Sequence, residues 1–503
     1  MSESAAPAQS EFRTVGRHTL VYGAGLMLGK LASFLMLPVY TRFLSTADYG
    51  VLELLGMTID VIAMIAGVGL ASGVFKFYSE LSGEADRRKL LATAALGSTA
   101  LALVTALAGM ALAGPLNQLV FRGASDPQYF RIFFLIYFFQ SAAAPGLLLM
   151  RIRERSVLFV AANLATLVAQ LSLNIWFLVF RGMGLEGVML GNALVSGASA
   201  LALGAYTVRH VGVAFSLPRF RQLARFGAPL IVVSLGSFVL TFSDRYFLNW
   251  FTDTASVGVY ALAYRFSFVL STLTVVPFSQ VWEPRRFEVA RRPDAGEVYR
   301  RMFLYYSLVL VGGAALMTAV IRDVLAVMAA PEFLPAHRVV PLILVATILQ
   351  QWAAYACVGL YLRSRTGVLA WVSVASVAVT LLLNALLIPR FGMMGAAWAT
   401  IGAYVLRFGL TYAFSQAAYR IHYPWARVSV LVMLFLGVSA ARLLVTPSSL
   451  RASLAFGLLL ALATLVVGWQ VLDAGAKAAL RGFLRRRARP AYPADAGRQP
   501  GLV

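Results

Sequence analysis

Apolar runs long enough to cross a bilayer recur along almost the whole chain. A helix needs about 20 predominantly apolar residues to span the hydrocarbon core. Of the 503 residues 60% are hydrophobic, and the mean hydropathy is +0.77, which is more apolar surface than a soluble protein of this length can bury. The sequence therefore predicts an all-α polytopic membrane protein. We expect fourteen spans, near residues 19–40, 51–75, 90–114, 130–150, 156–180, 184–208, 226–250, 257–282, 302–328, 339–362, 367–389, 393–418, 425–446 and 451–472.

The distribution of positive charge supports this number of spans. If the N-terminus is cytoplasmic, 30 of the 43 Lys and Arg residues fall in cytoplasmic segments and 9 in outer segments. Lys and Arg accumulate on the cytoplasmic side of membrane proteins, and a missed span would remove the asymmetry. We therefore predict cytoplasmic N- and C-termini. The polar segment 1–18 does not have the form of a cleavable signal, so the first apolar run is expected to remain as a span.

The basic cytoplasmic segments indicate which surfaces the chain contacts. Cations that flank spans contact anionic lipid headgroups, so we predict anionic membrane lipids, and no nucleic acid, as partners. The loop 283–300 is long enough for a short amphipathic helix on the membrane. The tail 473–503 is basic and then rich in Pro, Ala and Gly, a composition that predicts disorder.

The sequence shows no pattern of a catalytic, metal or cofactor site. Cys357 is the one cysteine, so a disulfide within the chain and a cysteine metal cluster are excluded. Neither a Ser/His/Asp set nor paired carboxylates in a loop occur, and the outer loops are too short for a catalytic domain. We therefore predict neither an enzyme nor a metal site. The four histidines lie far apart, at His18, His210, His337 and His422.

Several short features repeat at one offset. Gly50, after the first span, matches Gly258, after the seventh, and "GLEG" at 184–187 matches "GMMG" at 392–395; both shifts are 208 residues. "NIWFLVFRGMG" from Asn174 resembles "NALLIPRFG" from Asn384, with a two-residue indel. Such periodicity indicates a repeated six-helix unit with both halves in the same orientation. In this scheme "DYG" (48–50) and "SVG" (256–258) are the turns before each second helix.

The repeat predicts how the chain is divided. We expect a cytoplasmic segment 1–18, an N-lobe 19–208 with spans 1–6, and a cytoplasmic linker 209–225. A C-lobe 226–418 with spans 7–12 follows, and then spans 13 and 14 within 419–472 and the tail 473–503. The two lobes are pseudo-symmetric, and the last two spans lie outside the repeat.

An ordered set of motifs resembles one family of transporters. The motifs are "LPVYTRFLSTADYGVLEL" (37–54), "FGAPLIVVSLGSFVLTFSDRYFL" (226–248), "VGVYALAYRF" (257–266), "VWEPRRFE" (281–288) and Asn384 with "PRFGMMGAAWAT" (389–400). Together they resemble the Wzx-type polysaccharide flippases of the MOP (multidrug/oligosaccharidyl-lipid/polysaccharide) superfamily, over nearly the whole chain. The resemblance implies a V-shaped, MATE-like carrier of two lobes in the bacterial cytoplasmic (inner) membrane.

The resemblance also implies a function. Such carriers move an undecaprenyl-pyrophosphate-type lipid-linked oligosaccharide to the outer leaflet by alternating access, for O-antigen, capsule or exopolysaccharide biosynthesis. Other polysaccharide export and polymerisation proteins are the further partners that it implies. It also favours an ion-coupled cycle, with Asp60 or Asp244 as candidate ion carriers.

Charged residues inside spans are the candidate site, because a charge in the membrane is costly unless it has a function or a partner. Cations from both halves fit a basic cavity that binds an anionic headgroup. Tyr264, one helical step from a cation, is a candidate for stacking on a sugar ring. The candidate substrate-binding residues are Lys30, Arg42, Arg245, Arg265, Arg407 and Tyr264.

Structural roles for the same residues stay open. Arg42 and Arg245 are near span ends, where a long side chain reaches the interface without binding anything. Asp244 is placed to pair with Arg265 or Arg245 as a bridge between helices, and Asp60 to cap a helix or pair with Lys30. Tyr264 also fits an ordinary interfacial aromatic.

Three other functions remain as alternatives. A MATE-like drug/cation antiporter would have acidic residues dominating its cavity, whereas the deep charges here are mostly basic. A membrane-embedded polymerase or glycosyltransferase would need a catalytic outer loop. A lipid-binding scaffold in an export complex would not transport by itself.

Overall fold

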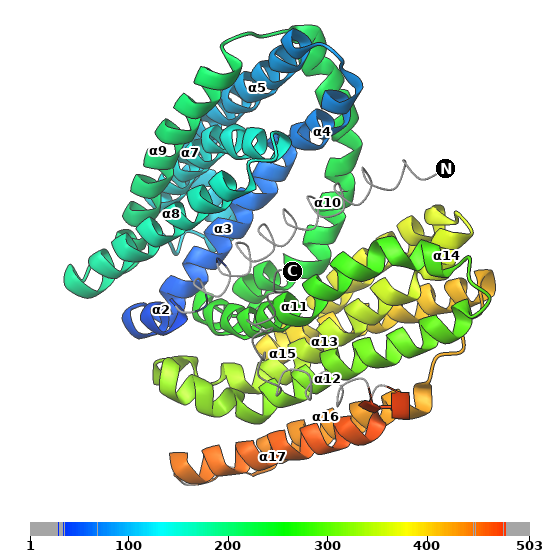
Figure 1. Cartoon of the computed structure of the whole chain (residues 1–503). Coiled ribbons are helices and arrows are strands. Elements are labelled where there is room, and N and C mark those ends of the chain that lie inside the picture. The colour runs from blue at the N-terminus through cyan, green and yellow to red at the C-terminus, as the bar shows by residue number, and fades with distance from the viewer. Residues whose placement is uncertain are drawn as a thin grey trace, which may run out of the picture. The chain divides into compact units, whose positions relative to one another are not determined.

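The chain is almost entirely helical in the computed structural model (Figure 1). The structure describes residues 29, 34, 36–67, 69–445, 447, 449–475, 477 and 478, and these residues contain no strand. The α-helices are α2 (Leu37–Phe43), α3 (Thr46–Ala66), α4 (Leu70–Glu80), α5 (Glu84–Ala111), α6 (Ala113–Phe121), α7 (Pro127–Ile152), α8 (Ser156–Ile175), α9 (Gly184–Val211), α10 (Leu217–Phe251), α11 (Thr254–Val289), α12 (Ala295–Met328), α13 (Ala336–Ala356), α14 (Val358–Leu362), α15 (Thr366–Ala418), α16 (Trp425–Leu444) and α17 (Leu450–Val471). A π-helix, η1 (Trp176–Phe180), continues α8, and a short 3₁₀-helix, η2 (Pro331–Phe333), precedes α13.

The helices confirm the predicted membrane spans. Within the described part of the chain, 12 helical segments are long and apolar enough to cross a membrane. One of them, α15, has 53 residues and contains two of the predicted spans, on either side of a break at Gly392. Every predicted span after the first coincides with one of these helices. The first predicted span, 19–40, lies mostly outside the described residues.

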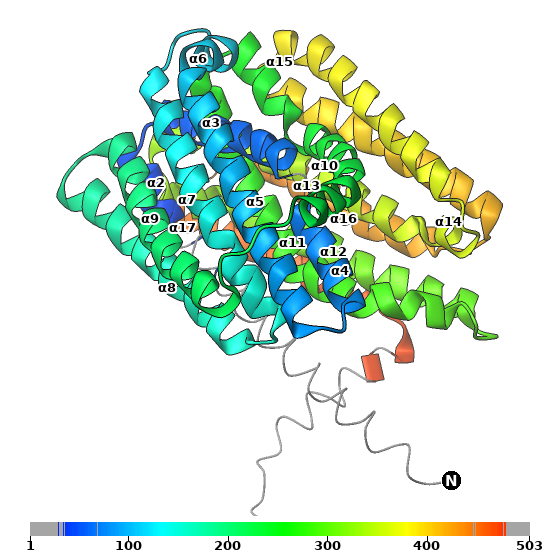
Figure 2. The same cartoon turned by 90° about the horizontal axis from the view of Figure 1, so that it is seen from above.

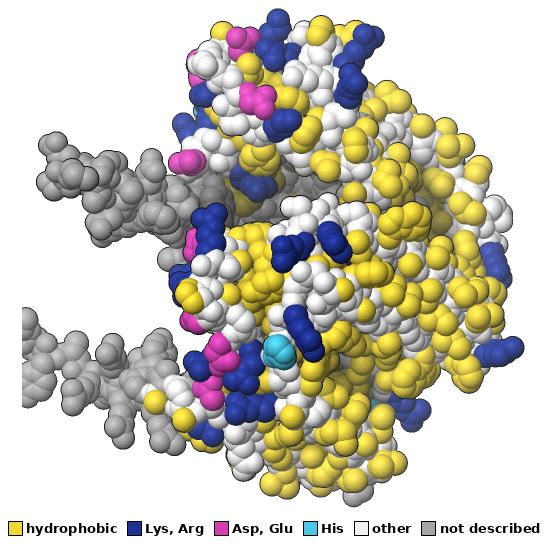
Figure 3. Space-filling model, turned by 90° about the vertical axis from the view of Figure 1, so that its right-hand side faces the viewer, with side chains coloured by type: hydrophobic (Ala, Val, Ile, Leu, Met, Phe, Trp, Pro, Cys, Tyr) yellow, Lys and Arg dark blue, Asp and Glu magenta, His cyan; other side chains and the backbone are white. Residues whose placement is uncertain are grey.

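Hydrophobic side chains cover much of the surface, as a bilayer requires. Leu201, Trp371 and Leu444 are each more than 75% exposed. On the face in Figure 3 the yellow hydrophobic side chains form a broad area, and the visible acidic side chains lie along its left-hand margin. This surface is that of a multi-pass membrane protein.

The described residues form two compact units. The first comprises Met1–Arg291 and Ile321–Arg420, and the second Arg292–Val320 and Ile421–Val503. Within the second unit the buried Arg442 of α16 donates to the carbonyl oxygen of Ala319 at 2.7 Å and to Ser453 Oγ at 3.2 Å. This cation, which lies at the end of its span, thereby ties α16 to both α12 and α17.

Within the first unit, helices far apart in sequence pack together. The N-terminal half places α7 between α5 and α9, and these helices lie side by side with α8 in both views (Figure 1, Figure 2). The C-terminal half packs α13 along α15. The two halves of the repeat meet where α3 packs against α11 and where α10 contacts α3, α4 and α5.

The turns before α3 and α11 lie earlier than the sequence analysis placed them. Ser45 caps α3: its Oγ accepts from the Asp48 amide at 3.1 Å, and Asp48 Oδ2 accepts from the Ser45 amide at 3.1 Å. Asp253 caps α11 by accepting from the Ser256 amide at 2.6 Å. "DYG" and "SVG" are therefore inside the first turns of these helices, so their assignment as turns was wrong. Side chains that cap free amides fix a helix start more strongly than the glycine that follows.

The loop 283–300 also differs from its prediction. α11 continues to Val289 and α12 begins at Ala295, so almost all of this segment belongs to the ends of two long helices. No separate amphipathic helix lies between them. Polar helix ends project beyond the apolar core of a span, and hydropathy therefore does not detect them.

The repeat is visible in the backbone as well as in the sequence. Gly184 and Gly392, which are 208 residues apart, have φ angles of +55° and +54°. Residues with a Cβ rarely adopt this left-handed region. Asn174 and Asn384 begin the two similar segments that differ by a two-residue indel, and both are fully buried. The same backbone device and the same buried amide occur in both halves, which supports two pseudo-symmetric lobes.

The close approach of α3 and α11 has the same symmetry. A Cβ on Gly50 would collide with the Thr254 carbonyl oxygen, and a Cβ on Gly258 would collide with the Thr46 carbonyl oxygen. Thr46 and Thr254 are also 208 residues apart. Equivalent surfaces of the two halves therefore meet at this crossing, where small residues let the backbones touch.

The left-handed glycine at the start of α9 makes a testable prediction. Replacing Gly184 with alanine is expected to destabilise the protein by ~1–2 kcal/mol, the cost of placing a Cβ in a left-handed conformation. No heavy atom lies within 4 Å of that Cβ, so backbone strain is the sole cost. Thermal unfolding in detergent measures the effect. Gly204→Ala on the same helix is the matched control, because its Cβ also meets nothing within 4 Å and its φ is not positive. Equal shifts in the two variants would contradict the role of the φ angle.

Candidate substrate-binding site

Charged side chains from three helices meet at one point in the first unit. α3 contributes Glu53, α10 contributes Asp244 and Arg245, and α11 contributes Arg265. α3 belongs to the first half of the repeat and α10 and α11 belong to the second. The cluster therefore joins the two halves through ion pairs, beside the crossing of Gly50 and Gly258.

Arg245 is the buried centre of the cluster. Its side chain is 0% exposed. Its Nη1 lies 3.1 Å from Asp244 Oδ1, and its Nε lies 3.4 Å from Glu53 Oε1. The guanidinium also stands 4.0 Å from the ring centroid of Tyr264. A cation without access to water needs such compensation by carboxylates and ring faces.

Asp244 is held by donors from two further helices. Its Oδ2 accepts from the hydroxyl groups of Tyr260 at 2.7 Å, Tyr264 at 3.1 Å and Thr400 at 3.4 Å. One oxygen thus faces Arg245 and the other faces three neutral donors. This carboxylate is a buried connection between α10, α11 and α15.

Arg265 is the exposed residue of the charged cluster. Its Nη2 lies 3.0 Å from Glu53 Oε2, and its Nε donates to the Tyr49 hydroxyl at 3.3 Å. The Arg265 side chain is 48% exposed, whereas that of Glu53 is 11% exposed. Glu53 therefore pairs with one buried and one accessible arginine, and Arg265 retains donors that an anion can reach.

A cavity of about 910 Å³ lies beside the Arg265 side chain. Its walls come from α2, α3, α7, α8, α9 and α11. Among the described residues that line it, the charged ones are Glu53 and Arg265. Tyr40 and Tyr49 line it as well. The cavity is thus a large space in the first unit with a cation at one wall.

The other candidate residues lie elsewhere. Tyr264 is buried under Arg245 and donates to Asp244, and it does not line the cavity. Arg42 is exposed, and its Nη2 donates to the Val327 carbonyl oxygen at 2.8 Å. It therefore caps the last turn of α12, a structural contact at a helix end.

Two further candidates, Arg407 and Asp60, make no ion pair or hydrogen bond with the charged cluster, and a third lies outside the described residues. Arg407 of α15 is half-buried and makes no ion pair or hydrogen bond with the described residues. Asp60 is exposed on α3. Lys30 lies outside the described residues. The structure thus brings Arg245, Asp244 and Arg265 together and leaves Arg42, Arg407 and Asp60 apart.

Glu53 is the residue that the sequence analysis missed. It pairs with both arginines, yet the sequence analysis did not single it out among the charged residues of the spans. The signal was present, because Glu53 falls within the predicted span 51–75, as Asp60 does. An acidic residue in a span deserves the same search for a partner as a basic one.

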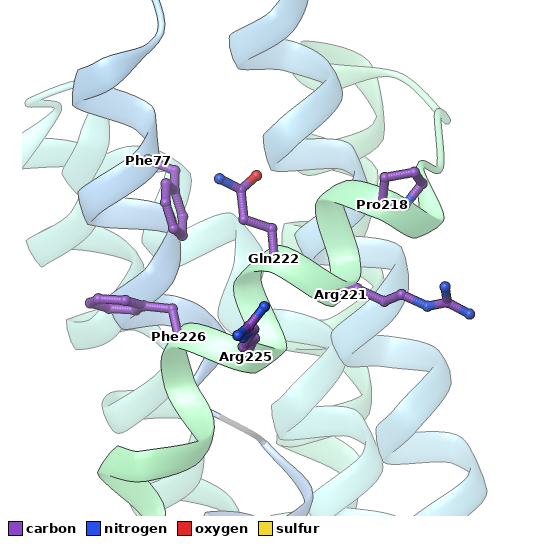
Figure 4. A pocket seen from close by; sticks show the side chains of 6 residues that line it. All are labelled: Phe77, Pro218, Arg221, Gln222, Arg225 and Phe226. Carbon is purple, nitrogen blue, oxygen red and sulfur yellow. The ribbon is translucent and has the colours of Figure 1, made fainter.

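A smaller cavity of about 440 Å³ lies where α10 begins (Figure 4). Figure 4 shows Gln222 and Phe226 of α10 on the side of Phe77, whereas Arg221 points away. Arg225 also lines the cavity. This is a basic and aromatic pocket at the end of a span, a composition that suits lipid headgroups.

The fold of the chain is shared with solved membrane transporters. The lipid II flippase MurJ in its inward closed conformation has a TM-score of 0.73 and 12% sequence identity, over 90% of this chain and 99% of that one. An inward-facing multidrug resistance MATE transporter of the MOP superfamily has a TM-score of 0.57 and 15% identity, over 80% and 96%. A MOP superfamily transporter from Pyrococcus furiosus has a TM-score of 0.56 and 13% identity, over 82% and 96%. The fold is therefore that of the MOP superfamily transporters.

The sequence itself identifies the family. The model of the family described as "Polysaccharide biosynthesis protein" matches residues 15–290, more than half of the chain. The chain belongs to this family. The succinoglycan biosynthesis transport protein ExoT of Rhizobium meliloti (strain 1021) is 26% identical over 244 residues, and the alignment spans 46% of each protein. These findings confirm the resemblance to polysaccharide flippases of the MOP superfamily, and the relatives are transporters rather than enzymes.

Proposed function

We propose that this protein is a flippase for a polyprenyl-pyrophosphate-linked oligosaccharide in surface polysaccharide biosynthesis. The observation that carries the proposal is the accessible guanidinium of Arg265 at the wall of a 910 Å³ cavity, in a chain of the polysaccharide biosynthesis family. A guanidinium binds phosphate oxygens through paired, charge-assisted hydrogen bonds. A drug/cation antiporter would have acidic residues dominating its cavity, whereas the described residues that line this cavity include one acidic and one basic residue, Glu53 and Arg265.

The ion pairs suggest how binding is coupled to movement. The pyrophosphate of the substrate competes with Glu53 for Arg265, and each guanidinium donor given to phosphate is one removed from Glu53. Loss of that pair weakens the link between α3 and α11, which belong to different halves of the repeat. The two lobes, 19–208 and 226–418, then rock to open the cavity to the other side while the lipid tail stays in the bilayer. Substrate binding thereby favours the state in which the lobes separate at this edge.

The exposure and the distribution of charged residues support proposals for the ion-coupling residue, the membrane location and a lipid site. Asp60 is our candidate for ion coupling, because its carboxylate is exposed and makes no ion pair with the described residues. The asymmetry of Lys and Arg supports a cytoplasmic membrane location with both termini inside. Anionic lipids are proposed at the smaller cavity, whose lining includes Arg221 and Arg225 as well as the Phe77 and Phe226 rings.

Transport by the reconstituted protein tests this function. Liposomes carry a fluorescent undecaprenyl-pyrophosphate-linked oligosaccharide, and its exposure at each leaflet is followed over time. Arg265→Gln is expected to slow transport about tenfold or more, because one charge-assisted contact to phosphate is worth about 1.5–3 kcal/mol. Arg181→Gln, which removes an exposed arginine outside the cavity, is expected to match the wild type.

Two results would contradict the proposal. If the wild type exports small organic cations and moves no lipid-linked sugar, the antiporter is the correct alternative. If Arg265→Gln transports the glycolipid at the wild-type rate, Arg265 does not bind the substrate.

A further inference from the structure

The part of the cavity formed by α7, α8 and α9 is polar but carries no charge. In a membrane span each uncharged polar side chain needs a hydrogen-bonding partner or water. Seven of them line this part: Gln140 of α7, Asn163, Thr166 and Gln170 of α8, and Asn192, Ser196 and Ser199 of α9. The concentration of amide and hydroxyl groups on one wall needs an explanation.

Spacing places these residues in two facing stripes. Asn163, Thr166 and Gln170 are three and four residues apart, which puts them on one face of α8. Gln170 Nε2 donates to Asn192 Oδ1 at 2.7 Å, and the hydroxyl groups of Thr166 and Ser199 lie 3.3 Å apart. These two pairs hold α8 to α9, as polar pairs do between membrane helices.

The packing of α8 against α9 does not account for the side-chain amides of Gln140 and Asn163. The Gln140 side chain is exposed to the cavity and makes no hydrogen bond with any residue that the structure describes. The Asn163 side chain donates at 2.8 Å to the Phe159 carbonyl oxygen of its own helix, and its Oδ1 is left to accept another bond. Both amides thus face the cavity with donors or acceptors that no neighbouring helix uses.

We propose that this surface, the amide wall (Gln140, Asn163, Gln170 and Asn192), binds the hydroxyl groups of an uncharged oligosaccharide. The inference rests on the proposed function, in which Arg265 binds the phosphate of the same molecule. An amide offers donors and acceptors side by side, as a sugar hydroxyl does, so the two match. The cavity volume of about 910 Å³ is at the upper end of small-molecule sites, about 300–1,000 Å³.

The absence of charge on the amide wall sets the chemical class of the glycan. Among the described residues that line the cavity, the charged ones are Glu53 on α3 and Arg265 on α11, so α7, α8 and α9 place no cation at the amide wall. A hexuronate on the glycan would bring a carboxylate against neutral groups inside the membrane, which is costly without a cation. The amide wall therefore selects neutral sugars over acidic ones.

Binding of three defined lipids to the purified protein tests this inference. The probes are undecaprenyl pyrophosphate with a tetrasaccharide of neutral hexoses, the same lipid with two hexuronates in the tetrasaccharide, and the lipid without sugar. The wild type is expected to bind the neutral glycolipid about tenfold more tightly than either of the others. The variant Gln140→Leu/Asn163→Leu is expected to lose about tenfold in affinity for the neutral glycolipid and to keep its affinity for the sugar-free lipid.

These two positions suit the test because neither side chain joins two helices, so the variant keeps the contacts that hold α8 to α9. Ser172→Leu, on the exposed side of α8 and outside the cavity, is the control and is expected to bind all three lipids as the wild type does. Equal binding of neutral, acidic and sugar-free lipids by the wild type would overturn the inference and leave the flippase intact. An equal loss for all three lipids in the double variant would also overturn it. If the wild type neither binds nor moves any of the three, the proposed function fails as well.

Discussion

Replacing Arg245 with methionine is expected to destabilise the protein by ~3–5 kcal/mol, the cost of leaving a buried charge without its partner. The Arg245 side chain is 0% exposed, and it balances Asp244 at 3.1 Å and Glu53 at 3.4 Å. Glu53 keeps Arg265 in the variant, but Asp244 keeps only neutral donors. Thermal unfolding in detergent, followed by size-exclusion chromatography, measures the loss.

Two variants separate charge from packing. Asp244→Asn/Arg245→Met removes both buried charges, so it is expected to recover a large part of the stability that Arg245→Met loses. Arg42→Gln removes an arginine of similar position in the span whose contact is one exposed hydrogen bond, and its expected effect is below ~1 kcal/mol. If the double variant is no more stable than Arg245→Met, lost packing around the guanidinium rather than the unpaired carboxylate causes the effect.

The helices were predictable because lipid leaves a chain few choices. Backbone amides in the hydrocarbon core must be paired within the segment, so length and hydropathy locate each span. The same rule fails at helix ends. α10 begins at Leu217 and α11 ends at Val289, beyond the predicted 226 and 282, because their ends project into water as polar helix. Capping residues carry that information, as Ser45 and Asp253 show.

The site was predictable in part. Asp244, Arg245 and Arg265 were found because a charge interrupts an apolar run, and depth along the span brought them near one edge. Depth does not show which way a side chain points. Packing against α3 buries Arg245 and leaves Arg265 accessible, although the two were equal candidates from the sequence. Only the packing around Glu53 shows that Arg265, and not Arg245, is accessible to a substrate.

The amide wall could not be predicted from the sequence, for a different reason. Asn, Gln, Ser and Thr occur in many membrane helices as interhelical pairs, so their presence in a run predicts no site. Gln140 and Asn163 are distinguished by what they lack, a partner on a neighbouring helix, and that is a property of packing rather than of composition.

A methyl group at the crossing of α3 and α11 is expected to have an effect of similar size. In Gly50→Ala the new Cβ would collide with the Thr254 carbonyl oxygen, and in Gly258→Ala with the Thr46 carbonyl oxygen. Overpacking usually costs ~1–3 kcal/mol. Because backbone atoms rather than rotatable side chains oppose the Cβ here, we expect ~3 kcal/mol or more for each variant. Gly56→Ala, also on α3, is the control, since its Cβ meets no heavy atom within 4 Å.

The symmetry of the crossing sharpens this prediction. The two collisions are related by the 208-residue repeat, so the two single variants are expected to lose nearly the same stability. Once the helices have separated to admit one methyl group, the second meets less resistance. The double variant is therefore expected to lose less than the sum of the two single losses, a non-additivity typical of groups in contact. If the stability losses of the two single variants add exactly in the double variant, the two glycines do not share one contact. If the single variants are as stable as Gly56→Ala, α3 and α11 do not pack closely at this crossing. Since Glu53 lies one turn beyond Gly50, the same separation is also expected to draw it away from Arg265, so that an anion would compete for the guanidinium more easily.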